Sequence, residues 1–319
     1  MRVYAILLIS IMFGSMPYPS YSQACCSAGT PLLSSMDVST TPAGSGHLAV
    51  TYVYNQLQDV FSGSEKIEGF RQRLSQSLIW ELSYGINQRW SVTGIFSWQQ
   101  QTRRLNSPNQ QQSLNRLTTD GMGDALILIK YNILPLNIIQ QRQIALGAGL
   151  KLPTGKSNLR DRGFLLPADM QPGTGSWDGV FWAYLYQGFL PKITANIFLN
   201  TSFRLNGTNN RYGLENSDFS GYRFGNEWVV NVGGAYRTLS RFDFSIVARY
   251  RQTAMDEFGG VSVSNTGGRW LYVSPGVNLN FSQFSLRFSG EWPVYRKLNG
   301  VQLTTSYKLD ASIFYQLQF

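Results

Sequence analysis

Residues 306–319 read SYKLDASIFYQLQF, and apolar or aromatic side chains occupy every second position of this stretch. The positions between them are mostly polar or charged, beginning with Ser306, Lys308 and Asp310. Because successive side chains of a β-strand point to opposite faces, this alternation predicts a strand with one apolar and one polar face. The apolar set is Tyr307, Leu309, Ala311, Ile313, Tyr315, Leu317 and Phe319.

The same period of two recurs along most of the chain. It is least clear in 177–190, where both faces are apolar, and in 122–135, where Leu126 and Leu128 interrupt the polar face. We expect about twelve strands on this pattern. They are expected at 47–61, 68–86, 89–104, 122–135, 142–153, 177–190, 193–206, 222–237, 241–255, 268–282, 284–297 and 302–319.

The segments between these strands alternate in length. Short periplasmic turns alternating with longer external loops, and an even number of strands, are typical of an outer-membrane barrel. The sequence therefore predicts an all-β fold, a transmembrane antiparallel up-and-down β-barrel. The short connections are near 87–88, 136–141, 191–192, 238–240 and 283, and the long ones are near 105–121, 154–176, 207–221 and 256–267.

A water-soluble β-sandwich would also alternate, so the period alone does not separate the two architectures. Strand length favours the barrel, because strands in soluble sheets have a mode of about 5–6 residues. Aromatic side chains near the strand ends also favour it, because membrane barrels carry aromatic girdles at both interfaces. We expect this girdle to include Tyr84, Trp90, Trp98, Tyr131, Tyr236, Trp270 and Tyr315.

The composition and the first residues fit an exported membrane protein. Charged residues make up 14% of the 319 residues, against about 25% in typical soluble domains. Residues 1–24 resemble a secretory signal, because the apolar stretch VYAILLISIMF is shorter than the ~20 residues of a transmembrane helix. We expect residues 25–46 to be a periplasmic segment or a lumen plug, and 47–319 to form the barrel.

Residues that could carry other chemistry are few. The net charge is +9, but Lys and Arg are scattered singly, so no nucleic-acid partner is expected. Cys25 and Cys26 leave three alternatives open: a lipid on Cys25, a soft-metal site, or an oxidised or unused pair. His47 is the only histidine and has no clear partner serine, so we expect a structural role. No catalytic residue, metal or cofactor is expected.

The polar strand faces carry many charges, which we expect to line the barrel interior. An Arg or Lys on the lipid face costs about 2–4 kcal/mol at the membrane midplane, which favours this assignment. Two roles remain open: a ladder of ion pairs that stiffens the barrel, or a water-filled path with a mild anion preference. The inward bases are Arg71, Arg73, Lys130, Lys151, Arg204, Arg223, Arg249, Arg251, Arg287 and Lys308, and the inward acids are Glu81, Asp124, Glu227, Asp243, Glu291 and Asp310.

Three ordered stretches carry glycine-rich motifs: GMGDALILIKY (121–131), LGAGLKLPTGK (146–156) and QPGTGSWD (171–178). They resemble the G-x-G-D…K-Y, G-x-K-x-P-T-G and P-G-T-G-S-x-D motifs of the family called "Putative MetA-pathway of phenol degradation". That resemblance implies an outer-membrane barrel transporter for small, aromatic or hydrophobic compounds. The matching positions are Gly121, Gly123, Asp124, Lys130, Tyr131, Pro153, Thr154, Gly155, Pro172, Gly173, Thr174, Gly175, Ser176 and Asp178.

We therefore expect a passive outer-membrane channel for small solutes. We hypothesise that Asp124, Lys151 and Asp178 fix the loop 154–176 over or into the barrel mouth. The alternatives are a plugged structural or assembly barrel and an outer-membrane lipid-modifying enzyme. The expected partners are outer-membrane lipid, a small solute, and the barrel-assembly machinery, because the final strand ending in Phe319 resembles the carboxy-terminal assembly signal of such barrels.

Overall fold

The computed structural model describes residues 39–69, 71–105, 116–137, 139–189, 194–213, 220–238 and 241–318. Within these ranges, twelve long antiparallel strands form a closed barrel. The expected fold class is thereby confirmed. The barrel strands are β1 (Ser45–Ser62), β3 (Arg71–Gly85), β4 (Trp90–Leu105), β6 (Ala125–Leu134), β7 (Arg142–Leu152), β10 (Asp178–Gly188), β11 (Ala195–Leu205), β14 (Glu227–Arg237), β15 (Phe242–Thr253), β18 (Gly268–Asn280), β19 (Phe284–Leu298) and β20 (Val301–Gln318).

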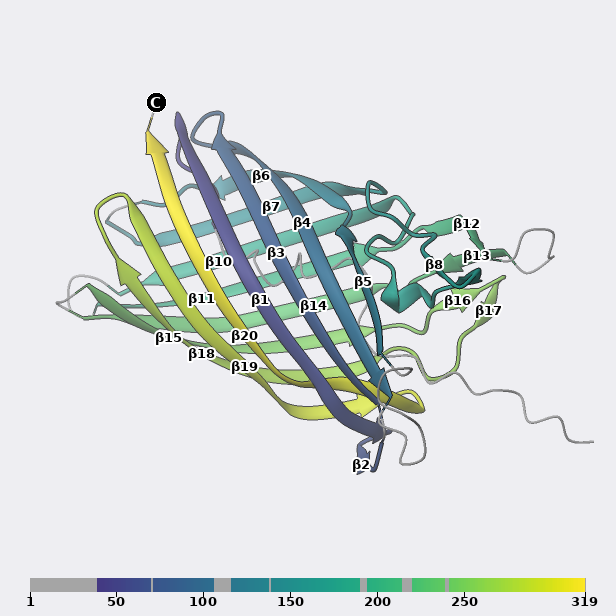
Figure 1. The fold of residues 1–319 in the computed structure, drawn as a ribbon. Helices are drawn as coiled ribbons and strands as arrows, with labels where there is room; N and C mark the ends of the chain where they lie inside the picture. The colour runs from purple at the N-terminus through teal and green to yellow at the C-terminus, as the bar shows by residue number, and fades with distance from the viewer. Residues whose placement is uncertain are drawn as a thin grey trace, which may run out of the picture.

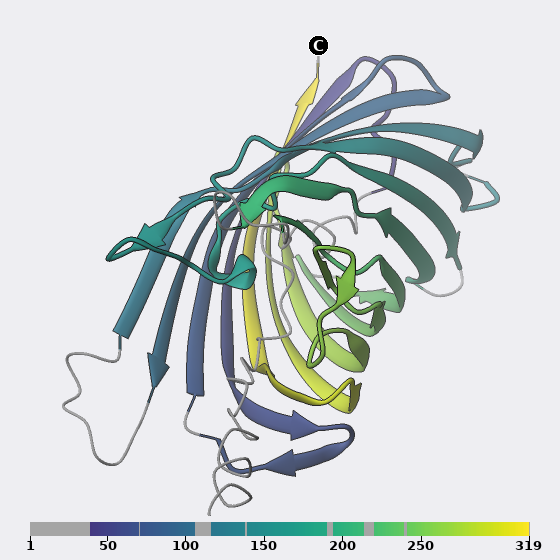
Figure 2. The same ribbon diagram turned by 90° about the vertical axis from the view of Figure 1, so that its right-hand side faces the viewer.

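The barrel closes because β1 pairs with a strand on each side. Thr51 lies opposite Ser312 of β20 and opposite Ile79 of β3. Ser45 pairs with Gln318, so the start of β1 and the end of β20 lie at the same end of the barrel, marked by the letter C in Figure 1. We call this the periplasmic end, following the usual topology of such barrels. Figure 2 views the opposite, external end.

Shorter elements decorate the external end (Figure 1). Parts of the expected long loops form short β-strands, because hairpins extend beyond the barrel wall. The elements are β2 (Glu65–Ile67), β5 (Arg116–Met122), β8 (Arg160–Asp161), β9 (Phe164–Leu165), the 3-10 helix η3 (Ala168–Met170), β12 (Thr208–Gly213), β13 (Ser220–Arg223), β16 (Glu257–Phe258) and β17 (Val261–Ser262). Four of them form a separate sheet in the order β12–β13–β16–β17.

Two boundaries of the expected strands are wrong. Residues 116–121 were expected in a loop, but they belong to β5, which extends the wall by pairing with β4. The expected strand 222–237 enters the wall only at Glu227. Arg223 therefore does not line the lumen: it lies in β13 of the external sheet, ion-paired with Glu257. A period of two continues from a wall strand into such a hairpin, so the pattern alone did not show where the wall stops.

The outward face of the wall is apolar. Large side chains from every part of the barrel are exposed there, as lipid contact requires, because a strand can cross hydrocarbon only in a closed sheet with an apolar exterior. No helix among the described residues is long and apolar enough to span a membrane. The exposed set includes Leu82, Phe96, Ile127, Ile129, Leu146, Leu150, Phe181, Leu185, Ile197, Phe203, Val232, Phe244, Ile246, Phe288, Trp292, Leu309 and Ile313.

The aromatic girdle differs from the expectation at one position. Trp90 and Tyr131 pack against each other on the outer face, with ring centroids 4.7 Å apart. Trp270, in contrast, is fully buried on the lumen side, where its indole N–H donates to Thr304 Oγ1 at 3.2 Å. It shares this face with the buried Tyr272 two residues along β18, so its inward position follows the strand period.

Candidate functional site

An apolar layer crosses the inside of the barrel. Its buried members come from seven wall strands, and Tyr186 and Phe198 pack against them. The two faces that the sequence left ambiguous are resolved here, because Val180 and Trp182 point inward while Phe181 points to lipid. The layer consists of Val53, Ile79, Ile95, Leu126, Leu128, Ala145, Val180, Trp182, Tyr184 and Val229.

Trp182 has the largest side chain of this layer, and the neighbouring strand makes room for it. The rings of Trp182 and Tyr184 are stacked with centroids 5.7 Å apart and planes 5° from parallel. Gly147 lies opposite Trp182 in β7, and a Cβ there would be 3.1 Å from the indole Cε3 atom. Lys130 Nζ lies 4.9 Å from the centre of the Trp182 ring, a cation–π contact at the edge of the layer.

A chain of ion pairs follows the opposite part of the wall. Glu227 accepts from Arg251 at 2.6 Å and from Arg204 at 3.3 Å. Glu291 pairs with Arg249 at 2.8 Å and with Lys308 at 3.2 Å. We call these side chains, together with Asp310 at 3.4 Å from Lys308, the ion-pair ladder. Sequence placed all of them inward, and the structure groups them around Glu227 and around Glu291, on β11, β14, β15, β19 and β20.

At the external end, Lys151 joins two strands to the loop of residues 153–177. Its ammonium group lies 2.7 Å from Asp124 Oδ2 and 2.8 Å from Asp178 Oδ2, and it also contacts the Thr174 hydroxyl. Asp124 accepts in addition from the backbone N–H groups of Gly155 at 3.0 Å and Thr174 at 2.8 Å. We call Asp124, Lys151, Thr174 and Asp178 the loop anchor. It ties the first and last residues of the loop to the wall.

Glycines of the three sequence motifs allow the close backbone contacts at the loop anchor. A Cβ on Gly155 would lie 2.7 Å from the Cα atom of Gly173, so the two arms of the loop cross in backbone contact. Gly175 has φ +71°, a conformation that glycine adopts without strain. The flanking motif residues also meet here. Thr154 Oγ1 accepts from Ala125 N–H, and Ser176 Oγ donates to Asp178. Pro172 packs beside Gly121, and Pro153 and Gly123 lie next to Thr154.

Beyond the anchor, the loop dips into the barrel rather than away from it. Arg73 donates to Asp169 Oδ2 at 3.0 Å, and both side chains are buried. Thr119 Oγ1 donates to the carbonyl of Met170 at 2.8 Å. Because η3 is held by side chains of β3 and β5, this loop covers the external mouth on the inside of the wall.

The four-stranded external sheet packs over the same loop. Tyr222 and Phe224 form a buried cluster with Ala168 of η3. The Tyr222 hydroxyl donates to Asp256 Oδ2 at 2.5 Å, and Gly225 N–H donates to Oδ1 at 2.8 Å. Burial raises the pKa of the Asp256 carboxyl despite these two donors, and burial next to Asp256 raises the pKa of Tyr222.

The residues that precede β1 lie against the inner wall at the periplasmic end. Thr40 is buried, donates to Asn132 Oδ1 at 2.8 Å and accepts from Gln143 Nε2 at 2.6 Å. Gly44 N–H donates to the Gly85 carbonyl at 2.8 Å. This part of the expected segment 25–46 therefore narrows the periplasmic opening, whereas residues 25–38, with Cys25 and Cys26, lie outside the described residues.

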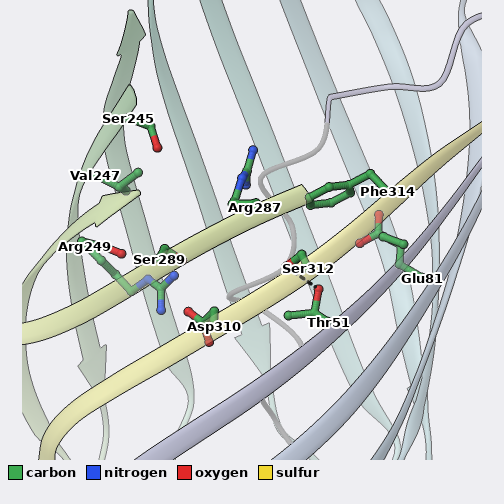
Figure 3. Close-up of a pocket in the computed structure, with 12 residues that line it drawn as sticks. Thr51, Glu81, Ser245, Val247, Arg249, Arg287, Ser289, Asp310, Ser312 and Phe314 are labelled. Atoms are coloured by element: carbon green, nitrogen blue, oxygen red, sulfur yellow. Dashed lines mark hydrogen bonds between the residues drawn. The ribbon is translucent and has the colours of Figure 1, made fainter. Parts of the chain in front are cut away.

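A pocket opens in the lumen between the ladder and β1 (Figure 3). It holds a cavity of about 50 Å³ within a wider space of about 670 Å³ that includes open solvent. Arg287 donates from Nε to Asn278 Oδ1 at 2.8 Å, and its guanidinium lies 5.2 Å from the centre of the Phe314 ring. We call this the lumen pocket; its lining is Ala49, Thr51, Glu81, Ser245, Val247, Arg249, Ser274, Arg287, Ser289, Asp310, Ser312 and Phe314.

These features follow one another along the lumen. Along β6 and β10, Asp124 and Asp178 of the anchor precede Leu126 and Val180 of the apolar layer on the same face. Along β1, Val53 of the layer and Thr51 of the pocket are likewise same-face neighbours. A solute entering from outside would meet the covering loop first, the apolar layer second and the lumen pocket third.

The remaining predicted residues occupy peripheral places. Arg71 is half-buried at the external end of β3, and Asp243 is buried near the periplasmic end, where Asn280 donates to it at 2.6 Å. His47 lies on the lumen face and stacks on Phe314 with centroids 5.7 Å apart. Phe319 lies outside the described residues. Within the described part of the chain, no three His, Cys, Asp or Glu residues are grouped as for a metal ion.

Sequence reasoning missed the side chains that close the lumen. Trp182, Tyr184 and Asp169 carried no motif, and the apolar character of both faces of 177–190 hid which set would face inward. The available signal was the alternation itself: the inward register of Asp178, fixed by its partner Lys151, places Val180, Trp182 and Tyr184 inward as well.

Comparison with known proteins gives a family and a fold. The family model described as "Putative MetA-pathway of phenol degradation" matches residues 76–309. No curated protein matches the chain. Among solved structures, the COG4313 outer membrane channel from Pseudomonas putida F1 is similar, with a TM-score of 0.70 and 14% identity over 88% of this chain and 98% of that one. The beta domain of the Bordetella autotransporter BrkA is more distant, with a TM-score of 0.44 and 11% identity over 85% and 99%.

Proposed function

Since the chain belongs to the family "Putative MetA-pathway of phenol degradation" and is an outer-membrane β-barrel, we propose that it is a passive channel for small solutes with an apolar, aromatic body. The observation that supports this most directly is the apolar layer. It crosses the lumen between the polar loop anchor and the polar lumen pocket. An apolar constriction excludes water and ions by dewetting, while it offers a ring-shaped apolar solute favourable contacts.

A similar solved structure agrees with this proposal in kind. The Pseudomonas putida protein is described as an outer membrane channel. At 14% identity this likeness shows the fold, so the solute class of the present chain is argued from its own lumen.

The loop 153–177 is the proposed external gate. Asp124, Lys151 and Asp178 fasten both of its ends, and Arg73 holds its tip at Asp169. Opening of the mouth then requires that the Arg73–Asp169 contact break and that the loop anchor release both ends of the loop. The other lumen charges brace the wall through the ion-pair ladder.

Two further functions were open from the sequence. The same buried layer and covering loop would also fit a plugged structural barrel. Solute flux separates the two, because a plugged barrel lets no solute pass. A lipid-modifying enzyme needs a catalytic side chain at the lipid surface, whereas His47 lies on the lumen face against Phe314. We propose that the protein is not an enzyme.

The test compares fluxes of matched solutes into proteoliposomes whose outer leaflet contains lipopolysaccharide. We expect the protein to accelerate entry of an aromatic solute such as phenol but not of glucose, and to conduct ions weakly in planar bilayers. Val180→Asp wets the layer and should raise ion conductance and glucose entry. Equal entry of phenol and glucose into wild-type vesicles would indicate an unselective water pore, and no entry of either would establish the plugged barrel.

A further inference from the structure

The pairing of β18 with β19 is interrupted in the middle of the barrel wall. Val273 pairs with Trp292, and the next pair along these strands is Gly276 with Ser289. Two pairs are therefore missing from the described wall between them, and we call this stretch the seam. It contains Pro275, which has no N–H to donate and is a residue that sheets otherwise confine to edges and bulges. Since backbone groups in hydrocarbon need partners, a seam with fewer pairs costs less to separate.

The outer face of the barrel is hollowed over the seam. A groove of about 840 Å³, open to the outside, lies across β1, β15, β18, β19 and β20. Its volume is in the range of ligand pockets, about 300–1,000 Å³. We call it the outer groove, and it is mostly apolar, with a lining that includes Phe244, Ile246, Phe288, Trp292 and Leu309.

The outer groove reaches through the wall to the lumen pocket. Ser245, Ser289 and Asp310 line both spaces, although they belong to the inward-facing sets of their strands (Figure 3). A groove on the outer face can reach inward side chains only where little side-chain volume fills the wall. Gly276 and Gly290 provide this condition on the two strands of the seam. The wall between the lumen and the lipid is therefore thin here.

Two contacts close the seam at rest. On the outer face, a Cβ on Gly290 would lie 2.4 Å from the Cη2 atom of Trp292, so the indole covers the space that the glycine leaves. Rotation about the side-chain bonds of Trp292 can uncover this space without moving the wall. On the lumen side, the ion pair of Arg249 with Glu291, 2.8 Å long, spans the seam from β15 to β19.

We propose that a neutral aromatic solute leaves the barrel sideways, through the seam into the outer groove and from there into the membrane. The inference rests on the proposed function and adds the exit route. The cavity of about 50 Å³ in the lumen pocket is too small to hold a ring, whereas the outer groove is large enough.

The chemistry on both sides of the seam favours this route for a neutral solute. Asp310 at the inner edge of the passage repels an anion, and hydrocarbon disfavours any charge. Hydrocarbon favours an apolar ring. The path along the barrel axis, in contrast, is narrowed at the periplasmic end by residues 39–44, with Thr40 held by Asn132.

The test locks the seam with a disulfide and measures phenol entry into proteoliposomes whose outer leaflet contains lipopolysaccharide. Val277 and Phe288 are directly opposite each other beside the seam, and both line the outer groove. Cysteines at opposite positions of paired strands are close enough for a disulfide. We expect the oxidised Val277→Cys/Phe288→Cys protein, made with Cys25→Ser and Cys26→Ser, to admit phenol at least fivefold more slowly than its reduced form. Ion conductance in planar bilayers should be the same in both forms.

The matched control is a disulfide across a neighbouring pair of strands. Val232 and Ala248 pair on the exposed outer face of β14 and β15, and Ala248 lies beside Val273 at the edge of the seam. Oxidation of Val232→Cys/Ala248→Cys should leave phenol entry unchanged. Heat-modified gel migration shows whether each variant is still a folded barrel.

A second variant removes the cover of the seam. Trp292→Ala should speed phenol entry at least twofold, whereas Trp228→Ala, which removes another outward indole that is also 46% exposed, should behave as wild type. Equal phenol entry by the oxidised and reduced locks would overturn the sideways exit, assign the outer groove to lipid chains and leave the channel standing. No gain in Trp292→Ala would also overturn it. Absence of phenol entry in the wild type would refute the channel itself, and the exit route with it.

Discussion

Lys151→Met removes the one cation of the loop anchor and keeps the length of the side chain. In the structure Lys151, Asp124 and Asp178 are at most 1% exposed. The substitution leaves two buried carboxylates with no ammonium group between them. Breaking a buried ion pair from one side costs about 3–5 kcal/mol.

This cost falls on the closed loop, because opening lets water reach both carboxylates. At about 1.4 kcal/mol for each factor of ten, the cost of about 3–5 kcal/mol should raise the open population of the loop 153–177 by about two to three and a half orders of magnitude. The β8–β9 hairpin of this loop supplies a reporter, since Phe164 is 79% exposed and is a chymotrypsin site. Cleavage there follows the open population when opening and closing are fast.

The assay is therefore chymotrypsin cleavage after Phe164 in the folded barrel, together with single-channel conductance. Lys156→Met removes an exposed lysine of the same loop and should leave both unchanged. Combining Lys151→Met with Asp124→Asn and Asp178→Asn leaves no unpaired charge and should return cleavage toward wild type. Cleavage of Lys151→Met within twofold of wild type would refute the role of the anchor.

Three more predictions concern the external sheet, the periplasmic end and assembly. The raised pKa of Asp256 means that the folded state holds the carboxyl proton more tightly than the unfolded state does. This group therefore contributes stability at low pH, and that contribution is lost as the pH rises through the folded pKa. The melting temperature of Asp256→Asn minus that of wild type should be more positive at pH 8 than at pH 4. A Cβ at Gly85 would collide with the Pro42 carbonyl oxygen, so Gly85→Ala should displace residues 39–44 and raise conductance in planar bilayers, and an unchanged current would contradict this. Deleting Phe319 should lower the yield of assembled barrel in the outer membrane while leaving phenol entry per assembled barrel unaltered.

The sequence by itself determined the strands and their faces. Alternation such as that of SYKLDASIFYQLQF specifies which side chains meet lipid, since a charge on that face costs about 2–4 kcal/mol at mid-membrane. This cost is local to each strand, so Arg249, Arg251, Glu227 and Glu291 could be placed inward without knowing the fold. The three glycine-rich motifs indicated the family for the same reason: they are contiguous in the chain.

Only the tertiary structure decided which inward side chains meet and at what depth. A period of two fixes the face of a strand but not its height relative to strands that are distant in sequence, which depends on the tilt and stagger of the closed barrel. That stagger brings Lys151 between Asp124 and Asp178, and gathers Val53, Trp182 and Val229 from distant strands into one apolar layer.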